Sequence, residues 1–271
     1  MNTHRVPIGD THLTVRDQGL GPALVFGHSL TFDSTIFDAQ AEALSEHFRV
    51  LRIDLHGHGS SGHPLSDYSL EQMAEDLPAV LDHLGVESCG YIGHSMGGMV
   101  GMRFALAHPE RVTRLALLNT SAAEQEQPLR DIFHQVNEDS RGKPTNPATV
   151  DFVLSLMFSE HFIAQAPAVV APFRRMLADP PEGDGTYFAA KAVIWRSSVL
   201  DRLGAIAIPT LVLTSDIDTS VPAQHSRAIA AQISGAALVE LEGAGHLTPV
   251  ERAGEVTALL RTHFQDLGAQ A

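Results

Sequence analysis

Hydrophobic and polar residues alternate with two different periods over roughly the first 120 residues. Short apolar runs at 23–28 and 49–54, bounded by Gly or Asp, predict β-strands. The segments 36–48 and 69–86 instead carry apolar residues at helical spacing, which predicts amphipathic helices. Strands and helices are therefore expected to alternate along this part of the chain.

The alternation continues to residue 119, with a strand expected at 88–93, a helix at 95–109 and a strand at 111–119. Repeated strand–helix–strand units favour a mostly parallel sheet with helices on both faces. The apolar run 115–118 suits a strand that is covered on both sides. The fold class expected is therefore α/β.

Strand signals stop at Ser121 and are absent to about Arg202, where Pro and Gly separate short helical patterns. This stretch predicts an all-helical cap over residues 121–202. The α/β pattern then returns, so residues 1–120 and 203–271 are expected to form one core domain.

The last part of that core contains two more predicted strands, 208–215 and 236–243. Helices are expected after them, at 222–233 and 249–267. The cap is therefore an insertion within one domain, and it is not a domain appended at an end.

Composition limits the classes of protein to which the chain belongs. No apolar run approaches ~18 residues and the N-terminal segment has no apolar core, so neither a membrane span nor a signal peptide is predicted and a cytoplasmic location is expected. Cys89 is the only cysteine, which excludes an intrachain disulfide. The net charge of −14 argues against nucleic acid and anionic membranes as partners.

The 15 histidines are scattered and no HExxH motif occurs. We therefore expect no metal site and no cofactor, and a small molecule as the binding partner. The oligomeric state is not predicted by the sequence.

One serine has the surroundings of a nucleophile. Gly93-His94-Ser95-Met96-Gly97 fits G-x-S-x-G, with a predicted strand before it and a predicted helix after it. Glycines permit a sharp turn there, which lifts the serine hydroxyl clear of the sheet beside the helix N-terminus. Ser95 is therefore predicted to be a catalytic nucleophile.

A serine hydroxyl needs a base, and the base needs a carboxylate that orients it. His246 lies between the last predicted strand and the final helix, at the edge of the sheet where ligands bind in α/β folds. Asp216 and Asp218 both follow the strand 208–215. We prefer Asp218 because it lies farther into the loop, and Asp216 is the alternative.

Two backbone N–H groups are candidates for an oxyanion hole. One belongs to Met96, which follows the serine, and the other to Leu30, in the loop after the strand 23–28. Asp54 and the residues 57–60 are expected to brace the neighbouring loop. In the cap, Trp195 is a candidate for contact with a substrate.

The chain resembles the α/β-hydrolase superfamily over nearly its full length. The motifs that carry the resemblance are GHSMGG, DLHGHGSSGHP, HPERVTRLALLNT, PTLVLTSDIDTSVP and EGAGH. The resemblance implies a helical cap inserted after the sixth strand, the chain order Ser…Asp…His for the triad, and no metal or cofactor.

Within that superfamily the chain is similar to 3-oxoadipate enol-lactonases and related small carboxylesterases. The carrying segment is SLTFDSTIFDAQAEALSEHFRVLRIDLHGHG. It departs from the enol-lactonase pattern at Phe37, where Trp is usual, and at His28-Ser29-Leu30-Thr31, where Asn-Ser-Leu-Gly is usual. His28, Ser29 and Phe37 are the substrate contacts that the resemblance implies.

The expected activity is hydrolysis of a small carboxylic ester or lactone through an acyl-enzyme. The same triad also serves hydrolases that cleave carbon–carbon bonds in ring-fission products, and haloperoxidase-like or perhydrolase-like enzymes. A third alternative is a ligand receptor on this fold that turns its ligand over slowly.

Overall fold

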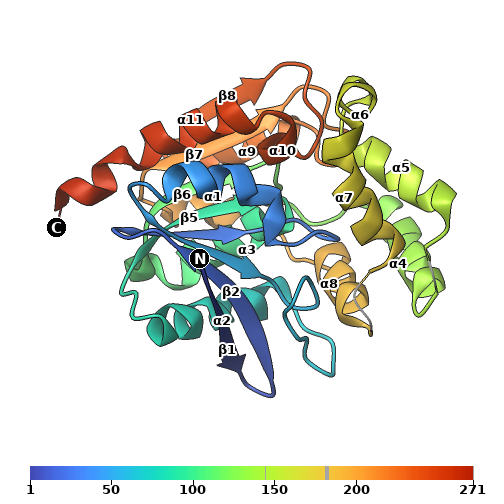
Figure 1. Cartoon of the computed structure of the whole chain (residues 1–271), viewed down its shortest axis with the longest axis horizontal. Coiled ribbons are helices and arrows are strands. Elements are labelled where there is room, and N and C mark those ends of the chain that lie inside the picture. Colours follow the sequence, from blue (N-terminus) through green and yellow to red (C-terminus); the bar gives the residue numbers. More distant parts are fainter. Residues whose placement is uncertain (144, 181–182, 271) are drawn as a thin grey trace.

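An eight-stranded sheet forms the centre of the molecule, in the order β1-β2-β4-β3-β5-β6-β7-β8 (Figure 1). The computed structural model describes residues 1–143, 145–180 and 183–270. β1 and β2 form an antiparallel hairpin, β2 is antiparallel to β4, and every later pairing is parallel. The predicted mostly parallel α/β sheet is confirmed.

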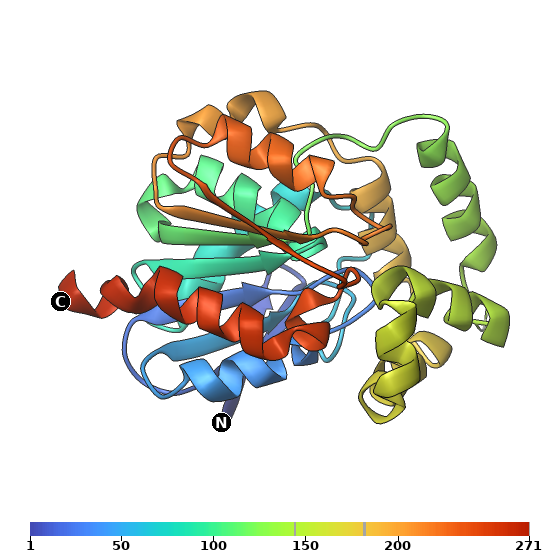
Figure 2. The same cartoon turned by 90° about the horizontal axis from the view of Figure 1, so that it is seen from above.

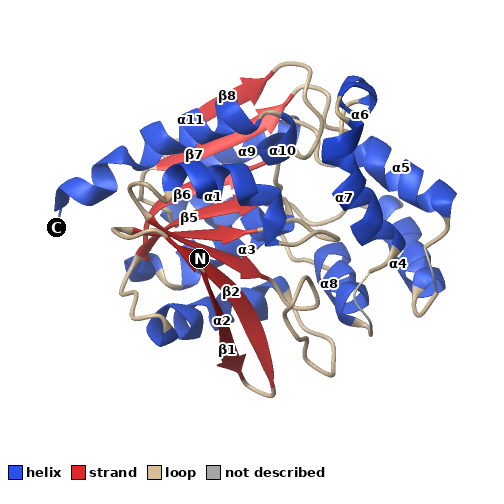
Figure 3. Cartoon of the chain, viewed as in Figure 1, coloured by secondary structure: helices blue, strands red, loops and turns tan. Residues whose placement is uncertain are grey.

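The secondary structure is coloured in Figure 3. The strands are β1 (Asn2–Ile8), β2 (Thr11–Gln18), β3 (Ala23–Gly27), β4 (Arg49–Asp54), β5 (Cys89–His94), β6 (Val112–Leu118), β7 (Thr210–Ser215) and β8 (Ala237–Leu241). The α-helices are α1 (Asp38–Leu44), α2 (Leu70–His83), α3 (Met96–Ala107), α4 (Leu129–Ser140), α5 (Pro147–Met157), α6 (Glu160–Gln165), α7 (Pro167–Ala178), α8 (Gly185–Ile194), α9 (Gln224–Gln232), α10 (Thr248–Glu251) and α11 (Ala253–Phe264). Short 3₁₀ helices are η1 (Ser34–Phe37), η2 (Pro109–Arg111), η3 (Leu200–Ala205) and η4 (Gln265–Gln270).

Helices cover both faces of the sheet. Alternate side chains of each strand point to opposite faces, so apolar residues on both faces need to be covered. Along β3, Leu24 and Phe26 pack into the core beneath α1 and α11, whereas Val25 packs into the core beneath α2 and α3. Both faces of the sheet are therefore apolar, and polar functional side chains are expected at the ends of the strands.

The helices α4 to α8 form a cap beyond the carboxyl ends of the strands (Figures 1 and 2). The cap enters after β6 and the chain returns to the sheet at β7. This confirms a helical cap inserted after the sixth strand. Across the described residues, no helix combines the length and apolar character needed to cross a membrane.

Two local features differ from the secondary structure that the sequence predicts. The hairpin of β1 and β2 was not predicted, although Gly9-Asp10 separates two alternating runs, which is a hairpin signal. The single helix expected over 249–267 is divided into α10 and α11 at Arg252, whose φ of −121° and ψ of 40° are not helical. The Arg252 guanidinium donates to the carbonyl oxygens of Glu242 and Gly243, a long-range contact that the local pattern does not contain.

Candidate active site

Ser95 lies in a strained turn between β5 and α3, which we call the serine turn (residues 93–98). Its φ is +52° and its ψ is −115°, a conformation that residues with side chains rarely adopt. A Cβ on Gly93 would lie 2.4 Å from the carbonyl oxygen of Gly97. A Cβ on Gly97 would lie 2.0 Å from the carbonyl oxygen of Gly27 in β3. Glycine is therefore needed on both sides of the serine because backbone packs against backbone there.

Asp218 and His246 meet at the same edge of the sheet. Asp218 follows β7, and His246 lies after β8 in what we call the histidine loop (residues 242–247). The Nδ1 atom of His246 is 2.7 Å from Oδ2 of Asp218, and both side chains are buried. With Nδ1–H donating to the carboxylate, the lone pair of Nε2 is free to accept a proton.

Asp218 is held as an ion by several donors. Its Oδ1 accepts the backbone N–H groups of Ser220 and Val221, each at 2.9 Å, and its Oδ2 also accepts the Asn119 amide at 2.9 Å. Burial alone would raise the pKa of Asp218, but His246 and these hydrogen bonds together lower it below its ordinary value. A carboxylate in this state orients an imidazole and stabilises its protonated form.

The His94 side chain connects the serine turn to the histidine loop by a hydrogen bond. Its Nε2 lies 2.8 Å from the backbone oxygen of His246, and the two rings are 4.8 Å apart. Burial, with a further contribution from His246, lowers the pKa of His94 to about 3. The neutral ring therefore donates Nε2–H to the backbone that carries the other imidazole.

The segment 28–31 lies against the N-terminus of α3. The backbone N–H of Gly97 donates to the carbonyl oxygen of His28 at 2.9 Å, and that of Thr31 donates to Nε2 of His58 at 3.1 Å. Met96 is the first residue of α3, where backbone N–H groups have no acceptor within the helix. Leu30 and Met96 thus belong to adjoining segments.

His28 has a bracing role between two loops. Its Nδ1 donates to the carbonyl oxygen of Ser29 at 2.7 Å, and its Nε2 accepts the N–H of Leu55 at 2.8 Å. Burial lowers its pKa, so the ring stays neutral. Both ring nitrogens are thus occupied by backbone, and the predicted contact of His28 with substrate stays a prediction.

The predicted substrate contacts of Phe37 and Trp195 stay predictions, and the structure shows what surrounds each side chain. Phe37 is fully buried in the core, edge-on to Phe26 with the ring centres 5.0 Å apart. Trp195 is 49% exposed, lies under the Arg130 guanidinium and lines a surface hollow together with Lys191. Core packing and the outer surface of the cap explain these two side chains.

Ser29 fits its predicted role better than the other three. Its hydroxyl is buried, and among the described residues it has no hydrogen-bond partner. It stays a candidate for a polar contact with substrate.

Asp216 is a structural turn residue. Its Oδ1 accepts the N–H of Gly243 at 2.7 Å, and its side chain is exposed. Asp54 has a similar bracing function, since its two oxygens accept the N–H groups of Ser34 and Ser60.

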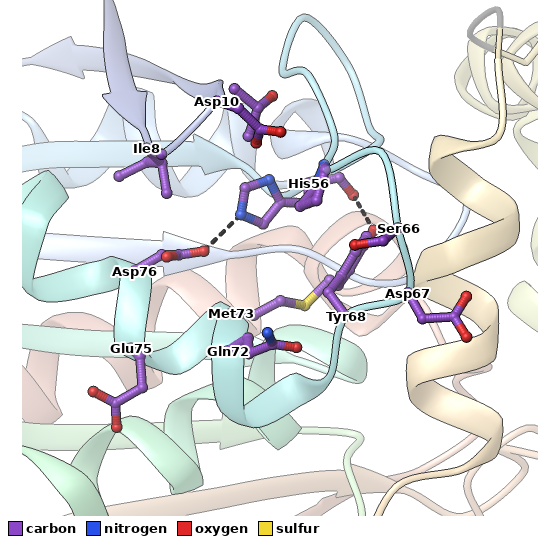
Figure 4. Close-up of a pocket in the computed structure, with 13 residues that line it drawn as sticks. Ile8, Asp10, His56, Ser66, Asp67, Tyr68, Gln72, Met73, Glu75 and Asp76 are labelled. Atoms are coloured by element: carbon purple, nitrogen blue, oxygen red, sulfur yellow. Dashed lines mark hydrogen bonds and ion pairs between the residues drawn. The ribbon is translucent and has the colours of Figure 1, made fainter.

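A surface groove of about 250 Å³ lies elsewhere on the molecule, between the hairpin of β1 and β2 and the helix α2 (Figure 4). His56 and Asp76 form a 2.7 Å pair in its wall, and the Tyr68 hydroxyl donates to the backbone oxygen of His56 (Figure 4). None of Ser95, Asp218 and His246 lines it. It is therefore not part of the candidate active site.

A sequence model of a family described as alpha/beta hydrolase fold matches residues 22–253. The chain belongs to this family. The α/β-hydrolase fold is thus confirmed both by the strand order and by the family match.

Three relatives within this family are similar over most of their length. A putative carbamate hydrolase RutD of Serratia proteamaculans is 28% identical over 87% of this chain and 88% of its own. A thermophilic esterase of Thermogutta terrifontis has a TM-score of 0.90 at 28% identity, covering 99% of this chain and 100% of its own. The enol-lactonase of Burkholderia xenovorans LB400 has a TM-score of 0.86 at 29% identity, covering 97% and 100%.

Two members of the polar network in this α/β hydrolase were missed in the sequence. Asn119 has a φ of +46° and joins Asp218 to the Thr248 hydroxyl. Glu251 accepts hydrogen bonds from the histidine loop and from the cap. Asn119 is the last residue of the strand predicted at 111–119, which was a usable signal, whereas no local pattern marks Glu251.

Proposed function

We propose that this α/β hydrolase cleaves a small carboxylic ester or lactone through an acyl-enzyme. Ser95 is the nucleophile, His246 the general base and acid, and Asp218 the carboxylate that orients the base. The contact of 2.7 Å between His246 and Asp218, beside the strained turn of Ser95, is the observation that carries this proposal.

In the proposed reaction, Nε2 of His246 takes the hydroxyl proton as Ser95 Oγ attacks the carbonyl carbon. The backbone N–H groups of Leu30 and Met96 are proposed to bind the oxyanion. His246 then protonates the leaving alkoxide, and the acyl group stays on Ser95. Water, deprotonated by the same imidazole, attacks the acyl-enzyme and releases the acid.

The relatives support the ester and lactone classes, because one is an esterase and another an enol-lactonase. A carbamate is the neighbouring class to test, since another relative bears the name putative carbamate hydrolase. All three substrates are attacked at an acyl carbon and use the same triad. We expect the active protein in the cytoplasm, acting on a small molecule without a cofactor.

The test is a panel of p-nitrophenyl esters of increasing chain length, lactones and carbamates, assayed with the wild type, Ser95→Ala and Ser66→Ala. Ser66 is exposed and serves as the matched control. Ser95→Ala is expected to lose about 10⁴- to 10⁶-fold in kcat, and Ser66→Ala to keep wild-type activity. Equal turnover by Ser95→Ala and the wild type would show that Ser95 is not the nucleophile. A wild-type kcat far below ~1 s⁻¹ on every substrate would instead favour the receptor alternative.

A further inference from the structure

The carboxylate of Glu251 hydrogen-bonds both to the cap and to the loop that carries His246. Oε2 of Glu251, the last residue of α10, accepts the backbone N–H of Ser159 at 3.0 Å and that of Gly245 at 3.1 Å. Its Oε1 accepts the Ser159 hydroxyl. Glu251 therefore joins the cap, between α5 and α6, to the residue that precedes His246.

Two further hydrogen bonds reinforce this junction. The N–H of Leu247 donates to the carbonyl oxygen of Met157 at 2.8 Å. The hydroxyl of Ser220 donates to the carbonyl oxygen of Leu156 at 3.2 Å, while the N–H of Ser220 donates to Asp218. The cap segment 156–159 thus contacts both loops that carry the proposed base and its carboxylate.

The approach at Gly245 is too close for any side chain. A Cβ there would lie 2.7 Å from the backbone nitrogen of Ser159 and 2.7 Å from the carbonyl carbon of Phe158. The histidine loop and the cap are therefore in backbone contact. Without an acceptor between them, the buried N–H groups of Gly245 and Ser159 would lose their hydrogen bonds, which would destabilise the contact.

We propose that Glu251 is a positioning residue for the reaction of the triad. Its carboxylate locks the cap segment 156–159 to the histidine loop, and this lock keeps the His246 imidazole in line with Asp218 and Ser95. The inference rests on the proposed function. It also implies that this corner of the cap stays closed during turnover, so substrate enters on another side.

The test compares Glu251→Ala, Glu251→Gln and Glu255→Ala. Glu255 is the matched control because it is an exposed acid on α11 whose ion pair with Arg252 is long, at 3.8 Å. Kinetics on the best ester are normalised to serines titrated with an organophosphate, so that misfolded protein does not count. Hydrogen–deuterium exchange is measured over 156–160 and 244–248.

Glu251→Ala is expected to lower kcat by about 10- to 100-fold with little change in KM, because a small misplacement of a catalytic group has effects of this size. Exchange should accelerate in both segments together. Glu251→Gln keeps one oxygen as an acceptor and should recover part of kcat, whereas Glu255→Ala should match the wild type.

A kcat for Glu251→Ala equal to that of Glu255→Ala, or faster exchange in the cap segment alone, overturns the inference. If Glu251→Ala does not fold, Glu251→Gln and Ser159→Ala decide it by the same two measurements. If the wild type hydrolyses none of the substrates, the proposed function fails, and the exchange experiment still decides whether Glu251 locks the two segments.

Discussion

The serine turn and the histidine loop lie side by side but are held by different forces. In the serine turn, backbone packs on backbone, and the glycines at 93 and 97 leave the space for it. The histidine loop is instead held by hydrogen bonds from outside it: the Asp218 carboxylate contacts the His246 ring, and the Glu251 carboxylate accepts the N–H of Gly245. The first region is fixed by sterics and the second by hydrogen bonds between distant residues.

This difference determines how each region should respond to substitution. A steric region fails as a whole when an atom is added, whereas a hydrogen-bonded network loses one interaction at a time. Substitutions around the histidine loop should therefore lower activity by different amounts. An added side chain in the serine turn should instead cause a large loss of stability.

The largest expected effect is that of Asp218→Asn. The amide cannot stabilise a protonated His246 and favours the wrong tautomer, so kcat should fall by about 10⁴-fold. Asp216→Asn is the control, because the Asp216 carboxylate accepts the backbone N–H of Gly243 in a turn. Steady-state ester hydrolysis measures both, and the opposite ranking of the two variants would move the role to Asp216.

Gly97→Ala should have the next largest effect, on stability. The added methyl group would lie 2.0 Å from the carbonyl oxygen of Gly27, and neither backbone can move without disturbing the sheet. We expect a loss of more than about 3 kcal/mol in the free energy of unfolding, or no soluble protein. Gly254→Ala, at an open position in α11, should instead be neutral or gain up to about 1 kcal/mol. Similar urea midpoints for the two variants would contradict the steric account.

The contrast also explains what could be predicted from the sequence. Strand and helix patterns are local, and they are enough to put Ser95, Asp218 and His246 after three parallel strands of one sheet. The serine turn itself is a motif of five residues, so its glycines can be read directly.

The network around the histidine loop was not predictable in the same way. Glu251 acts on residues 6 and 92 positions away in the chain, and only the packed fold brings them together. The division of the last helix at Arg252 has the same origin. Sequence position also does not show which way a side chain faces, so the substrate contacts predicted for His28, Phe37 and Trp195 stay predictions.

Stability at acid pH should reveal the neutral histidines of the site. The pKa of His94 is lowered to about 3 from 6.5, so between these values the unfolded chain binds a proton that the folded chain does not. Stability must therefore fall as the pH falls from 6.5 toward 3, by about 2 kcal/mol for this one residue at pH 5.

His94→Gln removes this titration and keeps a donor for the backbone of His246. The loss of stability between pH 7 and pH 5, measured by urea unfolding, should shrink by about 2 kcal/mol in this variant. The exposed His47→Gln should leave the loss unchanged. An unaltered pH dependence in His94→Gln would contradict a neutral, buried imidazole at this position.

The smallest effects are expected from the substitution of two threonines. One donates a hydrogen bond near the histidine loop, and the other donates a similar hydrogen bond to the serine turn. The Thr248 hydroxyl donates to Oδ1 of Asn119 at 2.7 Å, and the Thr120 hydroxyl donates to the carbonyl oxygen of Ser95 at the same distance. Valine has nearly the same shape as threonine, so each substitution removes only the donor.

Thr248→Val should cost about 1 kcal/mol of stability and lower kcat a few-fold, because the Asn119 amide that supports Asp218 loses its own anchor. Thr120→Val should cost less and leave kcat near the wild-type value, since the carbonyl oxygen of Ser95 still accepts the N–H of Met99 at 3.0 Å. Urea unfolding and ester kinetics on the two variants measure the difference. If Thr120→Val had the larger effect on kcat, the serine turn too would depend on individual hydrogen bonds, and the division between a steric and a polar region would not hold.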